Sequence, residues 1–454
     1  MSYCLFRRGI CSSFISKVKQ GGDERTTNTV QIARLGVSEE ASTVSPMKWN
    51  WNYLAIAKQR VGIAIFLMAL APAFADQFDT VNYIANAGFN YDDNVFRLPV
   101  DADPQIYLGK ESKSDVTRSV SLGINIDKKY SNQEVILNAL GTNFKYRNFS
   151  NLDYTSSSFK GAWNWQVSSR LSGALGATRV QTLISPADSR LYARNLNTTD
   201  NLSFNGDGRF GSNWHLLFGA SDGKNSNSIN AVNYLGSHST SKEWGGKYDP
   251  EDGKSVALIS RNLRVTNPNT EPDPWTLTDT GFSEKQLELR AAWQINGKSA
   301  LSGSLIKIDH RNFNFSQLDY KGNQGNLNYI LSLSGKTFLN LSLQRSMSSW
   351  LAFYSSYYVT DSVSISPSWQ VSAKTVMRMT INRGSNDYRN PIVPEAIHRN
   401  DATQSVLFGI DWTPQRAVTI SASVQHNKRT STPELYSSFG FDDNTASLSV
   451  QANF

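Results

Sequence analysis

Cysteine is nearly absent from this chain of 454 residues. Its two cysteines, Cys4 and Cys11, lie close to the N-terminus, so residues 76–454 contain none. Disulfide-stabilised folds and thiol catalysis are therefore excluded for the main part of the chain. Long hydrophobic runs are also scarce, since only one occurs and the mean hydropathy is −0.40. This composition excludes a bundle of membrane-spanning helices.

A strong charge of one sign is missing as well. The formal net charge is +7, but residues 1–75 hold nine basic and four acidic residues. Residues 76–454 therefore carry 36 basic and 34 acidic residues, a balance that gives no support to nucleic acid as a partner. Aromatic residues, in contrast, are plentiful: 11 Trp, 18 Tyr and 22 Phe exclude a disordered chain.

Residues 47–75 have the order of a secretory signal peptide. Positive charges precede the apolar run 61–70, and Ala73 and Ala75 occupy the small-residue positions of a cleavage site. The run is roughly ten to fifteen residues long, which is short for a membrane anchor. Residues 1–46 are polar and show no lasting period. We interpret them as an overcalled or disordered N-terminal extension, and the start codon stays open between the first and the second methionine.

Cleavage after Ala75 would make Asp76 the first residue of the mature protein. We expect the intact mass of the exported protein to correspond to residues 76–454. A mature protein that still carried residues 61–75 would contradict the signal peptide.

Strict alternation of apolar and polar residues recurs through residues 76–454. Alternation is the pattern of a strand with one apolar face and one polar face. It is clearest at the C-terminus, where Ala446, Leu448, Val450, Ala452 and Phe454 alternate with polar residues. The same pattern runs through 81–89, 120–126, 287–295, 406–412 and 418–424.

Short polar turns separate these strands at a spacing of about forty residues, the length of two spanning strands, a tight turn and a longer loop. The turns centre near residues 132, 169, 212, 252, 297, 335, 373 and 415. Longer connections alternate with them, at 92–115, 184–200, 264–281, 384–402 and 429–441.

Short turns at one end and long loops at the other are typical of an outer-membrane barrel. With both termini at the short-turn end, eight turns predict 18 strands, and 16 is the alternative because residues 222–254 alternate poorly. The predicted fold is all-β: an antiparallel, up-and-down transmembrane β-barrel in the Gram-negative outer membrane, formed by residues 76–454. A soluble β-sandwich or β-propeller is the competing fold. A propeller needs a recurring internal motif, and we identify none.

Residues 88–97, Gly-Phe-Asn-Tyr-Asp-Asp-Asn-Val-Phe-Arg, follow the first strand. This segment resembles the Tyr-Asp-x-Asn-hydrophobic-Phe-Arg segment of outer-membrane β-barrels encoded with exopolysaccharide operons. The final strand, ending in Phe454, is similar to the signal that the barrel-insertion machinery reads. Residues 76–454 as a whole resemble the EpsL family of exopolysaccharide biosynthesis outer-membrane proteins. The resemblance implies a role in moving or organising secreted polysaccharide, and it supplies no catalytic residue.

Catalytic motifs are not evident. The five histidines lack the spacing of a zinc site, and Ser157-x-x-Lys160 lacks the companion motifs of acyl-serine enzymes. We therefore expect no enzyme activity, no cofactor and no metal. The acidic runs 92–94 and 442–444, each Asp-Asp-Asn, lack the spacing of a calcium loop, and we interpret them as turn formers.

Strand parity predicts which charged side chains face the barrel lumen. Such charges avoid lipid, where Arg or Lys at the midplane costs about 2–4 kcal/mol, and their mixed signs suit neutral or weakly charged solutes. The lumen-lining candidates are Lys160, Asp207, Arg209, Glu288, Arg290, Arg378 and Asp411. A dense aromatic group could stack on sugar rings or belong to an interfacial girdle. Its members are Phe353, Tyr354, Tyr357 and Tyr358.

Three functions remain for such a barrel. The leading hypothesis is a channel for exopolysaccharide export, the alternative is a general porin for small solutes, and the weakest is a barrel-wall hydrolase. The expected partners are outer-membrane lipid, polysaccharide, the barrel-insertion machinery through the C-terminal strand, and periplasmic polysaccharide export proteins.

Overall fold

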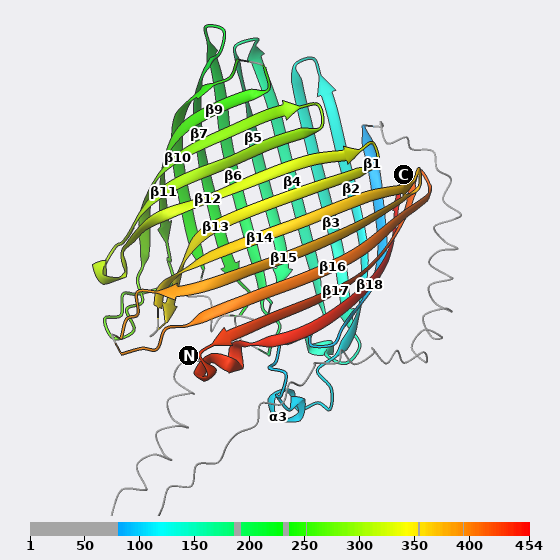
Figure 1. Cartoon of the computed structure of the whole chain (residues 1–454), viewed down its shortest axis with the longest axis vertical. Coiled ribbons are helices and arrows are strands. Elements are labelled where there is room, and N and C mark those ends of the chain that lie inside the picture. The colour runs from blue at the N-terminus through cyan, green and yellow to red at the C-terminus, as the bar shows by residue number, and fades with distance from the viewer. Residues whose placement is uncertain (1–79, 186–191, 230–235, 251, 353–354, 394) are drawn as a thin grey trace, which may run out of the picture. The chain divides into compact units, whose positions relative to one another are not determined.

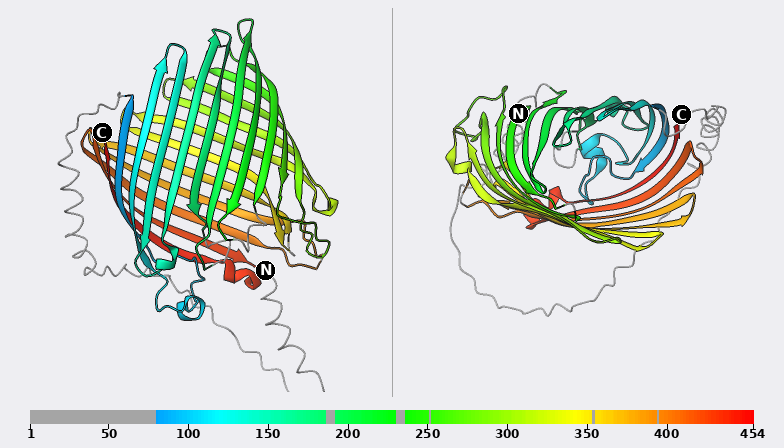
Figure 2. Two further views of the ribbon diagram at one scale, coloured as in Figure 1. Left: turned by 180° about the vertical axis from the view of Figure 1, so that it is seen from behind. Right: turned by 90° about the horizontal axis from the view of Figure 1, so that it is seen from above.

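Eighteen antiparallel strands form one closed sheet in the computed structural model (Figures 1 and 2). The structure describes residues 80–185, 192–229, 236–250, 252–352, 355–393 and 395–454, so the predicted signal peptide and residues 1–46 lie outside it. Each strand pairs with its sequence neighbours, and β1 pairs with both β2 and β18, which closes the barrel. The strands are β1 (Val81–Asp92), β2 (Asp115–Tyr130), β3 (Gln133–Tyr146), β4 (Tyr154–Ser168), β5 (Leu171–Leu183), β6 (Leu196–Phe210), β7 (Trp214–Asn227), β8 (Ser237–Tyr248), β9 (Lys254–Thr266), β10 (Gly281–Asn296), β11 (Ser299–Asn312), β12 (Tyr320–Ser334), β13 (Thr337–Ala352), β14 (Ser355–Ser372), β15 (Thr375–Arg389), β16 (Asn400–Gln415), β17 (Val418–Thr432) and β18 (Phe441–Asn453).

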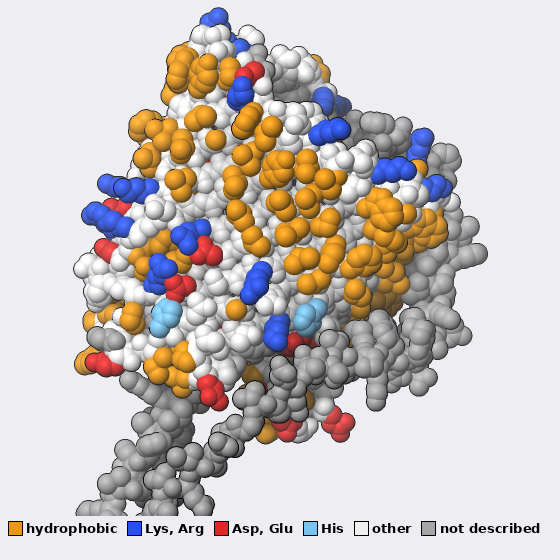
Figure 3. All heavy atoms as spheres, viewed as in Figure 1, with side chains coloured by type: hydrophobic (Ala, Val, Ile, Leu, Met, Phe, Trp, Pro, Cys, Tyr) orange, Lys and Arg blue, Asp and Glu red, His pale blue; other side chains and the backbone are white. Residues whose placement is uncertain are grey.

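The strand pairing places the apolar residues of neighbouring strands on one common face. Leu289 of β10 lies opposite Leu258 of β9 and Leu305 of β11, and these three side chains are 47%, 53% and 57% exposed. Because side chains alternate between the two faces, the residues between them point the other way. Figure 3 shows the outer face as a broad field of hydrophobic side chains. An exposed apolar field on the outside of a closed barrel is what a lipid environment requires.

The eighteen-strand prediction is confirmed, and the sixteen-strand alternative is wrong. The weakly alternating residues 222–254 contribute to β7, β8 and β9. Tight connections join the strands at one end, here called the turn end, and they fall at the predicted positions. The other end, the loop end, carries the longer connections. There the strands extend beyond the predicted limits, because β15 continues to Arg389 and β16 begins at Asn400 within the expected loop 384–402.

Helical structure in the described residues is short. The helix α3 (Pro104–Leu108) begins after Asp103, whose side chain accepts a hydrogen bond from the backbone N–H of Gln105. In the described part of the chain, 3-10 helices lie in other loop-end connections, as η1 (Ser150–Leu152), η3 (Ser316–Leu318) and η4 (Glu434–Phe439). Among the described residues, no helix is both long and apolar enough to cross a membrane.

An internal repeat relates two parts of the barrel, although no recurring motif was expected from the sequence. Residues 148–154 read Asn-Phe-Ser-Asn-Leu-Asp-Tyr, and residues 314–320 read Asn-Phe-Ser-Gln-Leu-Asp-Tyr. Each segment forms a 3-10 helix followed by a strand. The strands β10, β11 and β12 start 166 residues after β2, β3 and β4, at 281, 299 and 320 against 115, 133 and 154. The arrangement β2, β3, η1 and β4 is therefore repeated as β10, β11, η3 and β12.

The register makes a direct prediction for thiol labelling in lipid vesicles. A cysteine replacing Leu289 should face lipid and resist a charged methanethiosulfonate reagent, whereas one replacing Arg290 should react, because adjacent residues point to opposite faces. Residues 76–454 contain no other cysteine to confuse the result. Equal reaction rates at both positions would contradict the register.

Candidate functional site

The pairing register places the seven charged candidates on the face opposite the apolar field. Lys160 lies on β4, Asp207 and Arg209 on β6, and Glu288 and Arg290 on β10. Arg378 and Asp411 lie on the neighbouring strands β15 and β16. The structure therefore distributes these residues around the barrel wall, where only some of them contact one another.

Glu288 and Arg290 belong to a charged network that spans β8, β9 and β10. Its centre is Arg261 on β9, whose Nη2 lies 2.7 Å from Glu243 Oε2 and 3.4 Å from Glu288 Oε2. Arg261 also donates from Nη1 to Gln286 Oε1 at 3.0 Å. Arg290 donates from Nε to Glu288 Oε1 at 2.9 Å. Glu288 is therefore held between two arginines, and its side chain is only 6% exposed.

A second group joins β6, β7 and β8. Asp207 Oδ1 lies 2.6 Å from His215 Nδ1, and Asp207 Oδ2 lies 3.4 Å from Lys247 Nζ. Arg209 turns toward the turn end, where its Nε donates to the carbonyl of Ser212 at 3.0 Å. Arg209 is therefore placed apart from Asp207 even though both lie on one face of β6.

Two further candidates occupy other parts of the wall. Arg378 Nη1 lies 3.0 Å from Asp411 Oδ2, and Ser421 donates to Asp411 Oδ1 at 2.7 Å. Lys160 is an exposed side chain on β4. Taken together, the inner wall carries charges of both signs, mostly paired across strands.

The two Asp-Asp-Asn runs meet at the seam where β1 and β18 close the barrel. The backbone N–H of Asn444 donates to Asp93 Oδ1 at 2.7 Å, and its Nδ2 donates to Asp93 Oδ2 at 2.8 Å. Asn94 is fully buried, and its Nδ2 donates to the carbonyls of Leu98 at 2.8 Å and Asp442 at 3.1 Å. The runs therefore anchor the loop between β1 and β2, beyond the turn formation expected of them.

Arg97 completes this seam. Its Nη1 lies 2.8 Å from Asp92 Oδ1, and its Nε lies 3.2 Å from Asp443 Oδ1. Arg97 has a backbone φ of 54°, in the left-handed region, so the loop reverses at this residue. The residue that ends the family-like segment 88–97 thus links the first strand to the last.

The loop between β1 and β2 packs against its neighbour between β3 and β4. Phe96 and Leu98 form a buried cluster with Phe149 and Leu152, and the rings of Phe96 and Phe149 meet edge to face at 4.9 Å. A cavity of about 240 Å³ lies beside this cluster. Its lining includes loop residues and the strand residues Asn90, Asp92, Thr117, Tyr146 and Tyr154. Because alternation puts these strand residues on the face opposite the apolar field, the loop covers part of the inner wall.

The loop between β17 and β18 covers another part of the loop end. Its residue Tyr436 packs in a buried cluster with Tyr388 of β15, near Trp350 and Tyr358. The hydroxyl group of Tyr436 donates to the carbonyl of Ile397 at 2.8 Å. Two loops from opposite sides of the seam are therefore ordered against the wall.

The aromatic candidates divide into two pairs. Phe353 and Tyr354 lie outside the described residues. The ring of Tyr357 stacks on Tyr320 at 4.4 Å, and Tyr358 lies 5.3 Å from Tyr388. Both rings are partly buried against protein, so a sugar would have to compete with these contacts.

Two carboxylates outside the strands fix loop-end connections. Burial raises the pKa of Asp279, but hydrogen bonds from the backbone and side chain of Asn314 and from Phe315 N–H outweigh this and lower it. Asp153 shows the same balance, because bonds from Tyr146 N–H and Lys145 lower its pKa in spite of burial. A lowered pKa keeps both groups ionised at neutral pH, and their contribution to stability is lost only as the pH falls through it.

Each histidine of the described residues is bonded to an acid or an amide. His215, His238 and His398 contact Asp207, Asp222 and Asp387. His310 and His426 contact Glu284 and Asn444. No group of three His, Cys, Asp or Glu residues among the described ones is arranged to hold a metal ion.

The terminal residue takes part in barrel closure. Phe454 N–H donates to the carbonyl of Tyr83 at 2.9 Å, and Tyr83 N–H donates to the carbonyl of Phe454. The final residue is therefore paired with β1, in the position from which a C-terminal strand closes the sheet.

A closed even-numbered barrel, an apolar outer face, a charged inner wall and a turn end opposite a loop end define an outer-membrane β-barrel. No family model and no curated protein matches the chain. Among solved structures, OpdK of Pseudomonas aeruginosa with vanillate is similar, at 12% identity over 82% of this chain and 99% of that chain, with a TM-score of 0.46. OccK2 (OpdF) of the same organism with glucuronate is 11% identical over 83% of this chain and 98% of that chain, with a TM-score of 0.46. The FrpB iron transporter of Neisseria meningitidis is 10% identical over 78% of this chain and 62% of that chain, with a TM-score of 0.45.

Proposed function

We propose that this barrel is a passive channel for small polar solutes across the outer membrane. The observation that carries the proposal is an inner wall of mixed, cross-strand-paired charges centred on Arg261 and Glu288. Paired charges of both signs offer hydrogen bonds to a passing polar solute without holding one sign of ion tightly. The lumen-lining role of Lys160, Asp207, Arg209, Glu288, Arg290, Arg378 and Asp411 is part of this proposal.

The ordered loops favour small solutes over a polymer. The loop between β1 and β2 and the loop between β17 and β18 both pack against wall residues at the loop end. Such loops reduce the width open to a solute, and a bulky polymer would have to displace the buried contacts of Phe96 and Tyr436.

Passage of secreted polysaccharide is the second candidate, and it rests on the EpsL-like segment 88–97. One observation favours it. The inner positions of β14 read Thr360, Ser362, Ser364, Ser366 and Ser368, a hydroxyl-lined track that suits a hydroxyl-rich chain. Periplasmic polysaccharide export proteins would be the partners in that case, and Tyr357 and Tyr358 would be the sugar-stacking residues.

Reconstituted protein separates the two candidates. Vesicles containing the barrel should swell in glucose or glucuronate and should exclude dextran of several kilodaltons. Rapid dextran entry would favour polymer passage. In cells, gene deletion with periplasmic build-up of polymer would support export, whereas unchanged export with slower uptake of small solutes would support the porin.

A further inference from the structure

The outer face of β8–β12 is strongly basic toward the loop end. Strand pairing places Lys242, Arg264, Lys285, Lys307, Arg311 and Lys321 on this face, and Asp309 is the acidic residue among them. On the inner face of the same strands the charges balance. Three acidic residues there are matched in number by three basic ones: Glu243, Glu284 and Glu288 against Lys247, Arg261 and Arg290. The basic excess therefore belongs to the surface that surrounds the barrel and is no general property of these strands. Figure 3 shows Lys and Arg side chains gathered on the flank beside the apolar field.

The basic side chains form a patch because their strands pair in register. Lys285 lies opposite Asp309, and Asp309 lies opposite Lys321. Directly opposed residues have Cβ atoms about 5 Å apart. Asp309 accepts bonds from Arg311 at 3.1 Å and from Lys321 at 3.0 Å. Within the described part of the chain, Lys285 and Lys307 have no ion-pair partner, so the patch keeps a net positive charge.

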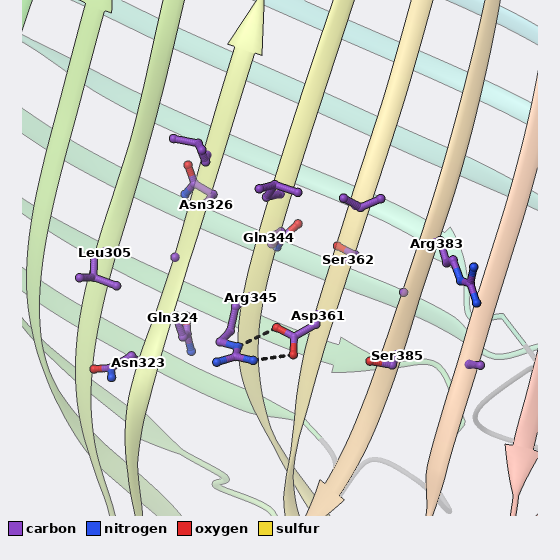
Figure 4. A pocket seen from close by; sticks show the side chains of 16 residues that line it. Leu305, Asn323, Gln324, Asn326, Gln344, Arg345, Asp361, Ser362, Arg383 and Ser385 are labelled. Atoms are coloured by element: carbon purple, nitrogen blue, oxygen red, sulfur yellow. Dashed lines mark hydrogen bonds and ion pairs between the residues drawn. The ribbon is translucent and has the colours of Figure 1, made fainter.

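A shallow groove of about 850 Å³ begins beside this patch and crosses the outer face from β11 to β16. Lys307 lies opposite Asn323, which lines the groove. Apolar residues such as Leu305 and Leu343 form part of the lining. Figure 4 shows Arg345 and Asp361 joined across the middle of the groove, with Arg383 beyond them. The groove therefore combines apolar walls with cations.

We propose that the patch of Lys285, Lys307 and Lys321, with the adjoining groove, binds a phosphorylated glycolipid of the outer leaflet. The loop end of such a barrel faces the cell exterior, so the patch lies at the level of the outer headgroups, just above the apolar field. Lysine and arginine stems lie along apolar surface while their charged ends reach the headgroup. Phosphates would contact the patch through charge-assisted hydrogen bonds, and an acyl chain would lie along Leu305 and Leu343. This inference rests on the outer-membrane location and is independent of which solute the lumen passes.

Native mass spectrometry of the detergent-solubilised protein tests the proposal with bisphosphorylated lipid A, dephosphorylated lipid A and inorganic phosphate as probes. Wild-type protein should retain bisphosphorylated lipid A. Changing Lys285, Lys307 and Lys321 together to glutamine should weaken that binding at least about tenfold, since basic residues near an anionic headgroup attract it. Wild-type protein should bind dephosphorylated lipid A at least about tenfold more weakly, and inorganic phosphate should compete poorly.

The matched control removes the same charge at the other end of the barrel, by changing Lys298, Lys336 and Lys374 at the turn end to glutamine. This control, and a Lys→Arg change at the three patch positions, should bind lipid A like the wild type. Equal loss in both glutamine variants, or equal binding of dephosphorylated lipid, would overturn the proposal. Full competition by inorganic phosphate would assign the patch to a free anion and would also overturn it. Solute flux in vesicles should be unchanged in the patch variant. A failure of the proposed channel function would therefore appear in the flux measurement and not in the lipid-binding measurement.

Discussion

Replacing Asp401 with alanine is expected to lower the free energy of unfolding by about 3–5 kcal/mol, because the buried charge of Arg399 then loses the carboxylate of Asp401 that balances it. Arg399 is 1% exposed and Asp401 is fully buried. Arg399 Nη2 lies 2.6 Å from Asp401 Oδ2, and its Nε lies 2.9 Å from Oδ1. The guanidinium also lies 3.8 Å from the centre of the Phe439 ring, which ties the pair to the loop between β17 and β18.

Urea unfolding of the protein in lipid vesicles would measure this change, and limited proteolysis would report release of the loop. The matched control is Asp252→Ala, which breaks a Lys–Asp pair at the turn end, outside the apolar field, whose side chains are 57% and 47% exposed. We expect the control to cost less than about 1 kcal/mol. A double variant, Arg399→Met with Asp401→Leu, should regain much of the loss because no buried charge remains. Equal destabilisation by Asp401→Ala and Asp252→Ala would show that burial of the pair is not what matters.

The strand count and the turn positions could be predicted because lipid imposes a simple pattern. Positions that face the lipid core are predominantly apolar, so residues such as Leu287 and Leu289 recur with period two. The alternating pattern ends at the edge of the apolar field, whereas the backbone hydrogen bonds between strands continue beyond that edge. Arg389 and Asn400 were therefore expected in a loop, although they belong to β15 and β16.

The contacts of the loop end were harder to predict, because they join residues that are distant in sequence. Arg97 and Asp443 are brought together only by closure of β1 on β18. The two Asp-Asp-Asn runs beside the first and last strands were a usable signal, since closure makes those strands neighbours. Parity assigned Glu288 to the polar face, but no sequence pattern indicated that Arg261 would bridge it to Glu243, because residues 222–254 alternate weakly.

Changing Arg261 to glutamine is expected to raise the cation preference of the channel about threefold. The change leaves the carboxylates of Glu243 and Glu288 without their shared cation, and one unit charge about 6 Å from a permeating ion in water is worth somewhat less than 1 kcal/mol. Reversal potentials across a planar bilayer under a potassium chloride gradient would measure the shift. The opposite variant, Glu288→Gln, should shift the reversal potential in the other direction, toward anion preference. Arg261 and Arg290 keep their positive charges in this variant.

The control for this experiment is Arg311→Gln, which removes the same charge from the outer face of β11. Arg311 lies on the opposite side of the barrel wall from ions in the lumen, and salt at 0.1 M screens charges that are more than about 10 Å apart. We therefore expect no shift in the Arg311 variant. The two variants should differ because Arg261 lies on the inner face of the barrel wall and Arg311 on the outer face. Equal shifts in the two variants would place both residues at the same distance from the ion path and would contradict the inner-wall assignment.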